Sequence, residues 1–194
     1  MKYQRFNKNS KSEYNLIFIY EDNLSSLNKS DIEKVALDDM KSAVSKKLIN
    51  GKASTTNIFA SNFYDKNYFL IGLGKKNDLT IQIFEKSLNI ALKMINSYDI
   101  KSISVDLRNT NLKNYNNLQG CIIEIEKTQY SYRKATDSSL RECVLKISEK
   151  ISTAAFNNIK NNSVAVANGL NTARRLGDTP PNICNPSFLA KEAK

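Results

Sequence analysis

The amino-acid sequence contains no histidine among its 194 residues. This absence excludes every Ser-His-Asp and Cys-His nucleophile arrangement from the chain, together with every imidazole metal site. Carboxylates alone can hold a metal, but such sites need several of them to converge, and the acidic residues of this sequence are dispersed. We therefore predict that the chain contains no catalytic residue, no cofactor-binding residue and no metal ligand.

Long apolar runs and clustered cysteines are also missing. No segment approaches the roughly 18 apolar residues of a membrane-spanning helix, and Met1 to Tyr20 carries charges where a signal peptide has its apolar region. Cys121, Cys143 and Cys184 lie far apart and form no CxxC pair, which argues against a disulfide framework and a thiolate metal site. The sequence predicts a cytoplasmic protein with three reduced thiols and no membrane contact.

Basic residues are in excess, with 29 Lys and Arg against 19 Asp and Glu and a formal net charge of +10. Such an excess raises the question of nucleic-acid binding. Pairs such as Lys46-Lys47 and Arg174-Arg175 are spread along the chain, however, and no window holds the run of basic residues that is typical of a polybasic patch. We expect solvated faces and keep nucleic-acid binding as the less favoured alternative.

Short apolar runs alternate with longer stretches of helical periodicity. Ser30 and Glu33 form a capping-box pattern, and apolar residues follow at helical spacing until Asn50-Gly51, which predicts a helix between these marks. The stretch 112–127 fits both periods, and we choose the helix. The expected strands are 14–20 as the first, then 55–60, 68–73, 101–107 and 141–147, and the other expected helices are 80–95 and 153–176.

Strands that alternate with helices of this length indicate an α/β fold. We expect three layers, with helices flanking both faces of a mixed, mostly parallel sheet. A chain of this size is near the usual single-domain length. We assign residues 1–150 to an amino-terminal α/β domain, residues 151–179 to a long linker helix that belongs to the same domain, and residues 180–194 to a linker.

Two glycines follow the strand predicted at 68–73 and invite a phosphate-binding interpretation. Gly72-Leu73-Gly74 could let backbone amides approach an anion before a helix begins. The full GxGxxG pattern is missing because Asn77 occupies its last position. We therefore favour a plain turn, and the neighbouring Lys75 and Lys76 support a nucleotide site only slightly.

The segment from Leu176 to Ala190 combines the end of one helix with the start of another. We expect Gly177 to adopt the left-handed conformation that ends a helix, and Pro180-Pro181 prevents further continuation. Asn185-Pro186 supplies an N-cap and a first-turn proline for a new helix. These features alone predict a linker between two helices.

The same region resembles the signature of the leucyl aminopeptidase (cytosol aminopeptidase) family. The stretch ANGLNTARRLGDTPPNICNPSFLAKEA matches it at Ala167-Asn168-Gly169, Ala173-Arg174, Pro180-Pro181-Asn182 and Asn185-Pro186. In that family the signature marks the passage from an amino-terminal domain to the catalytic domain. Weaker similarity at Tyr68 to Lys75 and at Tyr130 to Lys134 extends the resemblance over most of the chain.

The resemblance implies a macro-domain-like, non-catalytic amino-terminal domain of a metallo-aminopeptidase, a hydrolase that removes amino-terminal residues from peptides. Two divalent metal ions, zinc or manganese, would lie in the catalytic domain. Residues 180–194 would then lead into that domain, the partner on which Ile183, Phe188 and Leu189 pack. The resemblance also implies a homohexameric complete enzyme, whereas we expect the chain by itself to be inactive and monomeric.

A binding module is the alternative from another functional class. Macro-like folds elsewhere recognise ADP-ribose-type ligands, and glycine turns at strand ends could cradle a diphosphate. This alternative rests on analogy between folds. Nucleic-acid binding by the basic surface is the other alternative.

Overall fold

The computed structural model describes residues 1–6, 12–22, 32–98, 100–108, 110, 114–132, 140–147 and 151–193, with the backbone alone for 114–116. The strands are β1 (Lys2–Arg5), β2 (Tyr14–Ile19), β3 (Thr56–Phe59), β4 (Asn67–Gly72), β5 (Ser102–Asp106) and β6 (Glu142–Lys146). The helices are α1 (Lys34–Ser45), the 3-10 turn η2 (Lys76–Asp78), α2 (Ile81–Ile95), α3 (Asn114–Thr128), α4 (Thr153–Asp178) and α5 (Pro186–Glu192).

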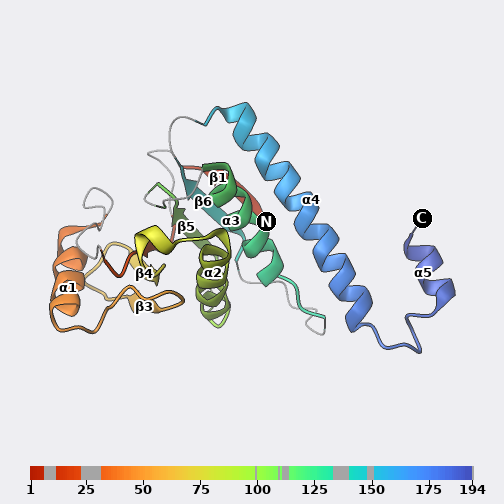
Figure 1. Ribbon diagram of the computed structural model, residues 1–194, viewed down its shortest axis with the longest axis horizontal. Helices are drawn as coiled ribbons and strands as arrows, with labels where there is room; N and C mark the ends of the chain where they lie inside the picture. Colours follow the sequence, from red (N-terminus) through yellow and green to blue (C-terminus); the bar gives the residue numbers. More distant parts are fainter. Residues whose placement is uncertain are drawn as a thin grey trace.

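The strands form one six-stranded sheet in the order β1-β6-β5-β2-β4-β3 (Figure 1). Among the described pairs, β3 with β4 is the antiparallel one, and the other four are parallel. The predicted α/β class with a mixed, mostly parallel sheet is therefore confirmed. The strand expected to be the first is β2, because the four residues of β1 precede it and pair with β6 at the sheet edge. Sequence periodicity missed β1 because a four-residue KYQR strand buries only Tyr3.

Two apolar cores, one on each face of the sheet, hold the three layers together. The larger core lies between one face of the sheet and the helices α2, α3 and the beginning of α4, and it includes Phe69, Phe84, Ile122 and Phe156. The smaller core lies on the opposite face, where α1 covers part of the sheet with residues such as Met40. The helical choice for residues 112–127 is confirmed by α3, whose Leu118, Cys121, Ile122 and Ile125 are all fully buried.

The start of α1 differs from the capping-box prediction. The helix begins at Lys34, and Glu33 is its extended N-cap residue without a capping side chain, while Ser30 lies outside the described residues. The Glu33 carboxylate instead accepts hydrogen bonds from the backbone N–H groups of Asp65, at 2.8 Å, and Lys66, at 3.1 Å. Glu33 thus fixes the turn before β4, and this long-range contact replaces the local one that the pattern predicts.

The start of α2 follows the sequence signal more closely. The Thr80 hydroxyl accepts a hydrogen bond from the Ile83 N–H at 3.3 Å and so caps the first turn. In the part of the chain that the structure describes, no helix is long and apolar enough to cross a membrane. All three cysteines are free thiols, and burial raises the pKa of Cys121 and Cys143.

Candidate functional site

The glycine turn after β4 is a packing feature. A Cβ at Gly72 would clash with the Lys52 carbonyl oxygen, and Gly74 has a φ of +77°, which favours glycine. The Gly74 N–H donates to the Gly51 carbonyl at 2.9 Å. The Lys76 N–H donates to the Asp22 carboxylate at 3.1 Å, so a side chain of the protein itself occupies the place of an anion. The plain turn that we favoured is the better interpretation.

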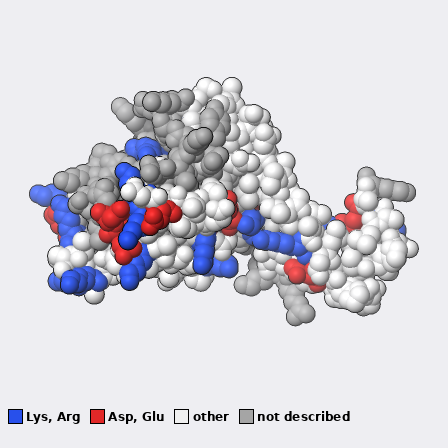
Figure 2. Space-filling view, viewed as in Figure 1, with Lys and Arg blue, Asp and Glu red and all other residues white. Residues whose placement is uncertain are grey.

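On one face of the described residues, the basic side chains do not gather into one continuous patch (Figure 2). On the face drawn in Figure 2, Lys and Arg are interspersed with Asp and Glu and separated by wide uncharged areas. Much of the described surface of α4 and α5 on this face is uncharged (Figures 1 and 2). This view offers no support for an electrostatic nucleic-acid footprint, which needs clustered cations.

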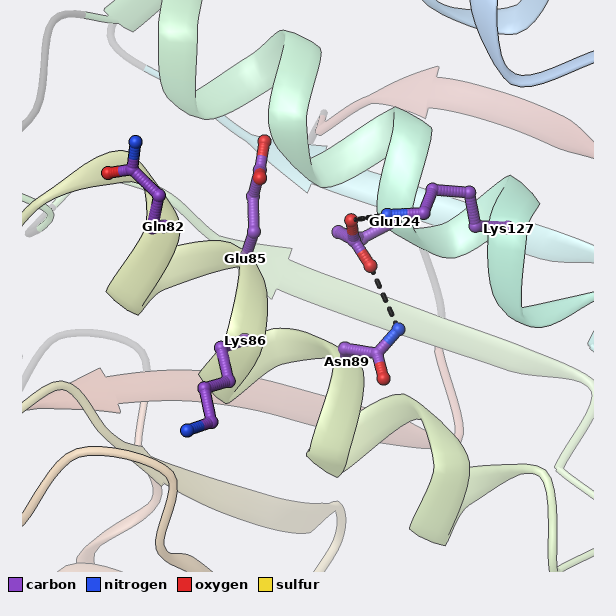
Figure 3. Close-up of a pocket in the computed structure, with 6 residues that line it drawn as sticks. All are labelled: Gln82, Glu85, Lys86, Asn89, Glu124 and Lys127. Carbon is purple, nitrogen blue, oxygen red and sulfur yellow. Dashed lines mark hydrogen bonds and ion pairs between the residues drawn. The ribbon is translucent and has the colours of Figure 1, made fainter. Parts of the chain in front are cut away.

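A polar groove of about 360 Å³ lies between α2 and α3 (Figure 3). Within it the buried Glu124 of α3 accepts a hydrogen bond from Asn89 of α2 at 2.9 Å and forms an ion pair with Lys127. Glu85 of α2 points toward α3, where Gly120 leaves room for its carboxylate. The groove thus joins the two helices through charged and polar contacts.

The chemistry available in this groove is limited. Burial raises the pKa of the Glu85 carboxyl, the Glu124 carboxylate raises it further, and the Lys127 ammonium lowers it. Among the described residues, no group of three or more His, Cys, Asp or Glu side chains could hold a metal ion. Glu124 already has two partners, so we assign the groove to helix packing.

The first half of α4 is part of the folded core. Ser152 caps the helix by accepting a hydrogen bond from the Ala155 N–H at 3.2 Å. One face is then buried at helical spacing, namely Phe156, Ile159, Ser163 and Ala167. Burial of this face attaches the beginning of α4 to the α/β domain.

The second half of α4 leaves the core, although the sequence predicts an apolar face through Leu176. From Asn168 onward no residue of the helix is fully buried, and Leu170 is 43% exposed. Polar contacts with the end of α3 take over: the Asn171 amide donates to the Glu126 carbonyl at 3.1 Å. Arg174 donates to the Lys127 carbonyl at 3.2 Å. These carbonyls lie in the last turn of α3, and they also accept from the N–H groups of Gln129, at 3.2 Å, and Tyr130, at 3.4 Å.

The corner after α4 confirms one expected helix signal and corrects another. Gly177 stays within the helix and has no left-handed φ, contrary to prediction. The helix ends at Asp178 because Thr179 precedes a proline and must adopt the extended conformation, with a ψ of 125°. Asn185 does cap α5, accepting from the Phe188 N–H at 3.0 Å, and Pro186 occupies the first turn.

The corner holds α5 beside the end of α4. The Pro180 carbonyl accepts hydrogen bonds from the N–H groups of Ile183 and Cys184, both at 2.9 Å. Arg175 of α4 forms an ion pair with Glu192 of α5. Figure 1 shows the resulting arrangement, in which α4 runs away from the sheet and α5 lies beyond its far end. We call residues 168–193 the distal arm.

Large apolar side chains of the distal arm are exposed. Leu170 and Leu189 are each 43% exposed and Ile183 is 49% exposed, while Phe188 is half-buried. No residue of α5 is buried. A seven-residue helix is marginal on its own in water, so such a segment needs a partner to be firmly held. The distal arm is therefore the candidate functional site.

Comparisons with known proteins place this arrangement in a family context. A family profile described as "Cytosol aminopeptidase family, N-terminal domain" matches residues 16–138. The chain is 32% identical over 141 residues to a probable cytosol aminopeptidase of Buchnera aphidicola subsp. Schizaphis graminum, covering 69% of this chain and 28% of that protein. It is 26% identical to a cytosol aminopeptidase of Haemophilus influenzae, with 100% of this chain and 41% of that protein covered.

Solved structures share the fold at low sequence identity. A mutant of tomato leucine aminopeptidase superposes with a TM-score of 0.74 at 15% identity, covering 99% of this chain and 40% of that chain. The bottromycin maturation enzyme BotP superposes with a TM-score of 0.67 at 12% identity, covering 94% of this chain and 36% of that chain. The chain thus spans less than half the length of the relatives that it matches.

Proposed function

The chain belongs to the cytosol aminopeptidase family, as an amino-terminal domain, and from this we propose that it supports a metal-dependent enzyme that removes amino-terminal residues from peptides. The domain itself contributes no catalytic group. Its role is to carry and position a catalytic domain, which would follow residues 180–194. Family membership does not favour the ADP-ribose-binding or nucleic-acid-binding alternatives.

The observation that carries this proposal is the distal arm. Its apolar side chains, Leu170, Ile183 and Leu189, are exposed, and they follow residues 16–138, which match the family's amino-terminal domain. Buried apolar area is what stabilises a domain interface. Assigning residues 151–179 to the amino-terminal domain is supported by the buried first half of α4.

The catalytic domain would supply the metal chemistry. Two divalent ions, zinc or manganese, would activate a water molecule and polarise the scissile carbonyl there. The complete enzyme would act in the cytoplasm on peptides and assemble as a homohexamer. The 194 residues by themselves would be a monomer in light scattering and would hydrolyse no leucine amide when zinc or manganese is added.

Hydrogen exchange tests the docking role of the distal arm. We compare the 194-residue chain with a protein in which the same chain is followed by a catalytic domain of the family. Amides of residues 168–193 should exchange at least about tenfold more slowly in the longer protein, because docking suppresses fraying. Leu189→Glu should remove this protection, whereas the control Leu48→Glu, at a 68% exposed site on the α/β domain, should not.

Two results would contradict the proposal. Equal exchange of the distal arm in both proteins would show that the catalytic domain does not cover it. Metal-dependent hydrolysis of a leucine amide by the purified 194-residue chain would show that it contains a catalytic site of its own.

A further inference from the structure

A second cavity, of about 400 Å³, opens at the carboxyl ends of three parallel strands. Arg5 ends β1, Lys146 ends β6, and Arg108 follows the end of β5. Phe6 and Ile147 complete the lining. Crevices outside the carboxyl ends of parallel strands are where open α/β sheets commonly bind ligands. The volume lies in the lower part of the range of small-molecule sites, which begins at about 300 Å³.

Cations dominate the chemistry of this cavity. Lys146 is only 6% exposed, and its ammonium lies 5.2 Å from the centre of the Phe6 ring. A smaller adjoining cavity shares Phe6 and Lys146 with the first and adds Lys66. Among the described residues that line or adjoin these two cavities, Asp106 is the one carboxylate, beside four cationic side chains.

Asp106 holds one of these cations in a fixed orientation. The Arg108 Nε donates to Asp106 Oδ1 at 2.9 Å, and the terminal guanidinium nitrogen donates to Oδ2 at 2.5 Å. This two-point contact fixes the plane of the guanidinium group at the cavity. Arg5 is oriented independently, because its guanidinium donates to the Ile151 carbonyl at 2.9 Å. The cavity is thus lined by cations whose side chains the fold has already ordered.

Electrostatic effects within the cavity point to a negative ligand. Burial lowers the pKa of the Lys146 ammonium, Arg108 and Lys66 lower it further, and Asp106 raises it. Burial also raises the pKa of the Asp106 carboxyl, so the compensating charge is itself disfavoured. A bound anion would relieve the cost of burying like charges together, and binding to the folded state alone would stabilise the protein.

We propose that this cavity binds a small phosphate monoester, with the phosphate against Lys146, Arg108 and Arg5 and the organic group against Phe6 and Ile147. A phosphate monoester suits the cationic lining because its two negative charges can pair with several cations at once. Guanidinium groups also match the geometry of the phosphate oxygens. The two apolar side chains favour an ester over the bare ion. This inference is independent of the role of the distal arm.

Calorimetric titration of the 194-residue chain at constant ionic strength tests the proposal, with phenyl phosphate and inorganic phosphate as probes. Phenyl phosphate should bind saturably with a dissociation constant below about 10 mM. Lys146→Met should raise this constant at least about tenfold, a loss of about 1.4 kcal/mol of binding free energy. Lys66→Met, at an exposed site, should weaken it about threefold by reducing the local positive potential. Lys93→Met removes the same charge from the exposed surface of α2 and should change nothing.

The contribution of the organic group is tested separately. Inorganic phosphate should bind more weakly than phenyl phosphate, and Phe6→Ala should reduce this difference. If Lys146→Met fails to fold by circular dichroism, Lys66→Met and Phe6→Ala carry the test. No saturable binding, or equal weakening by Lys66→Met and the control Lys93→Met, would overturn the site. Equal affinity for the two probes would overturn the assignment of an ester.

Discussion

The two halves of α4 belong to one helix but are held in different ways. The first half buries Phe156, Ile159 and Ala167 in the core of the α/β domain. The second half is tied to α3 by hydrogen bonds and leaves Leu170 exposed. The apolar spacing continues across both halves, so the difference lies in what stands opposite each of them. One helix can therefore be part of the core along its first half and expose apolar side chains along its second half.

The largest difference in stability between the two halves of α4 is expected for a substitution at Phe156. Phe156→Ala should lower the free energy of unfolding by about 3–5 kcal/mol, because it leaves a cavity beside a side chain that is 4% exposed. Leu170→Ala, the matched control in the second half, should cost less than about 1 kcal/mol. Urea unfolding of the 194-residue chain measures both values. Similar losses would mean that the second half is also buried in solution.

A smaller change tests the polar attachment. Asn171→Ala removes the donor seen at 3.1 Å from the Glu126 carbonyl, which keeps the Gln129 N–H at 3.2 Å, and should destabilise the chain by about 0.5–1 kcal/mol relative to Asn168→Ala. Both variants replace an asparagine with an alanine in α4, so their gain in helix propensity cancels. Equal urea midpoints for the two variants would show that this contact does not hold the distal half of α4.

The smallest change in stability is expected from a substitution in the groove between α2 and α3. Folding raises the Glu85 pKa above its ordinary value of 4.5, so its contribution to stability is complete below that value and is lost as the pH rises through the folded pKa. Glu85→Gln should therefore stabilise the chain at pH 7, by less than about 0.5 kcal/mol because the side chain is largely solvated. The difference between the two proteins should vanish near pH 4, and thermal unfolding across this range would measure it. A variant that is less stable than the wild type at pH 7 would contradict this sign.

Local patterns predicted the main strands and helices because burial on a sheet or helix face imposes a regular period. They failed where a distant contact decided the outcome. Glu33 carries a capping-box signal, but its carboxylate binds the Asp65 and Lys66 amides. Gly177 carries a helix-ending signal, but the proline after Thr179 sets the end at Asp178, two residues beyond the predicted end. The end of burial within α4 has no local signal at all, because it depends on where α3 stops.

The two proposed sites differ in the same respect. The part of the distal arm that follows α4 was anticipated because Pro180-Pro181 and Asn185-Pro186 form a contiguous pattern. The cationic cavity was not anticipated, because Arg5, Arg108 and Lys146 are isolated in the sequence and only the pairing of β6 with both β1 and β5 brings them together. Scattered cations become a site through topology.

The length of α4 has a mechanical consequence. A helix of 26 residues is about 39 Å long, so a tilt of about 5° at its first turn would displace its far end by about 3 Å. Such a displacement exceeds the tolerance of a packed interface. The contacts of Asn171 and Arg174 with α3 act three quarters of the way along this lever, where they restrain it far better than contacts near its base. The last turn of α3 thereby sets the position of whatever is attached beyond α4.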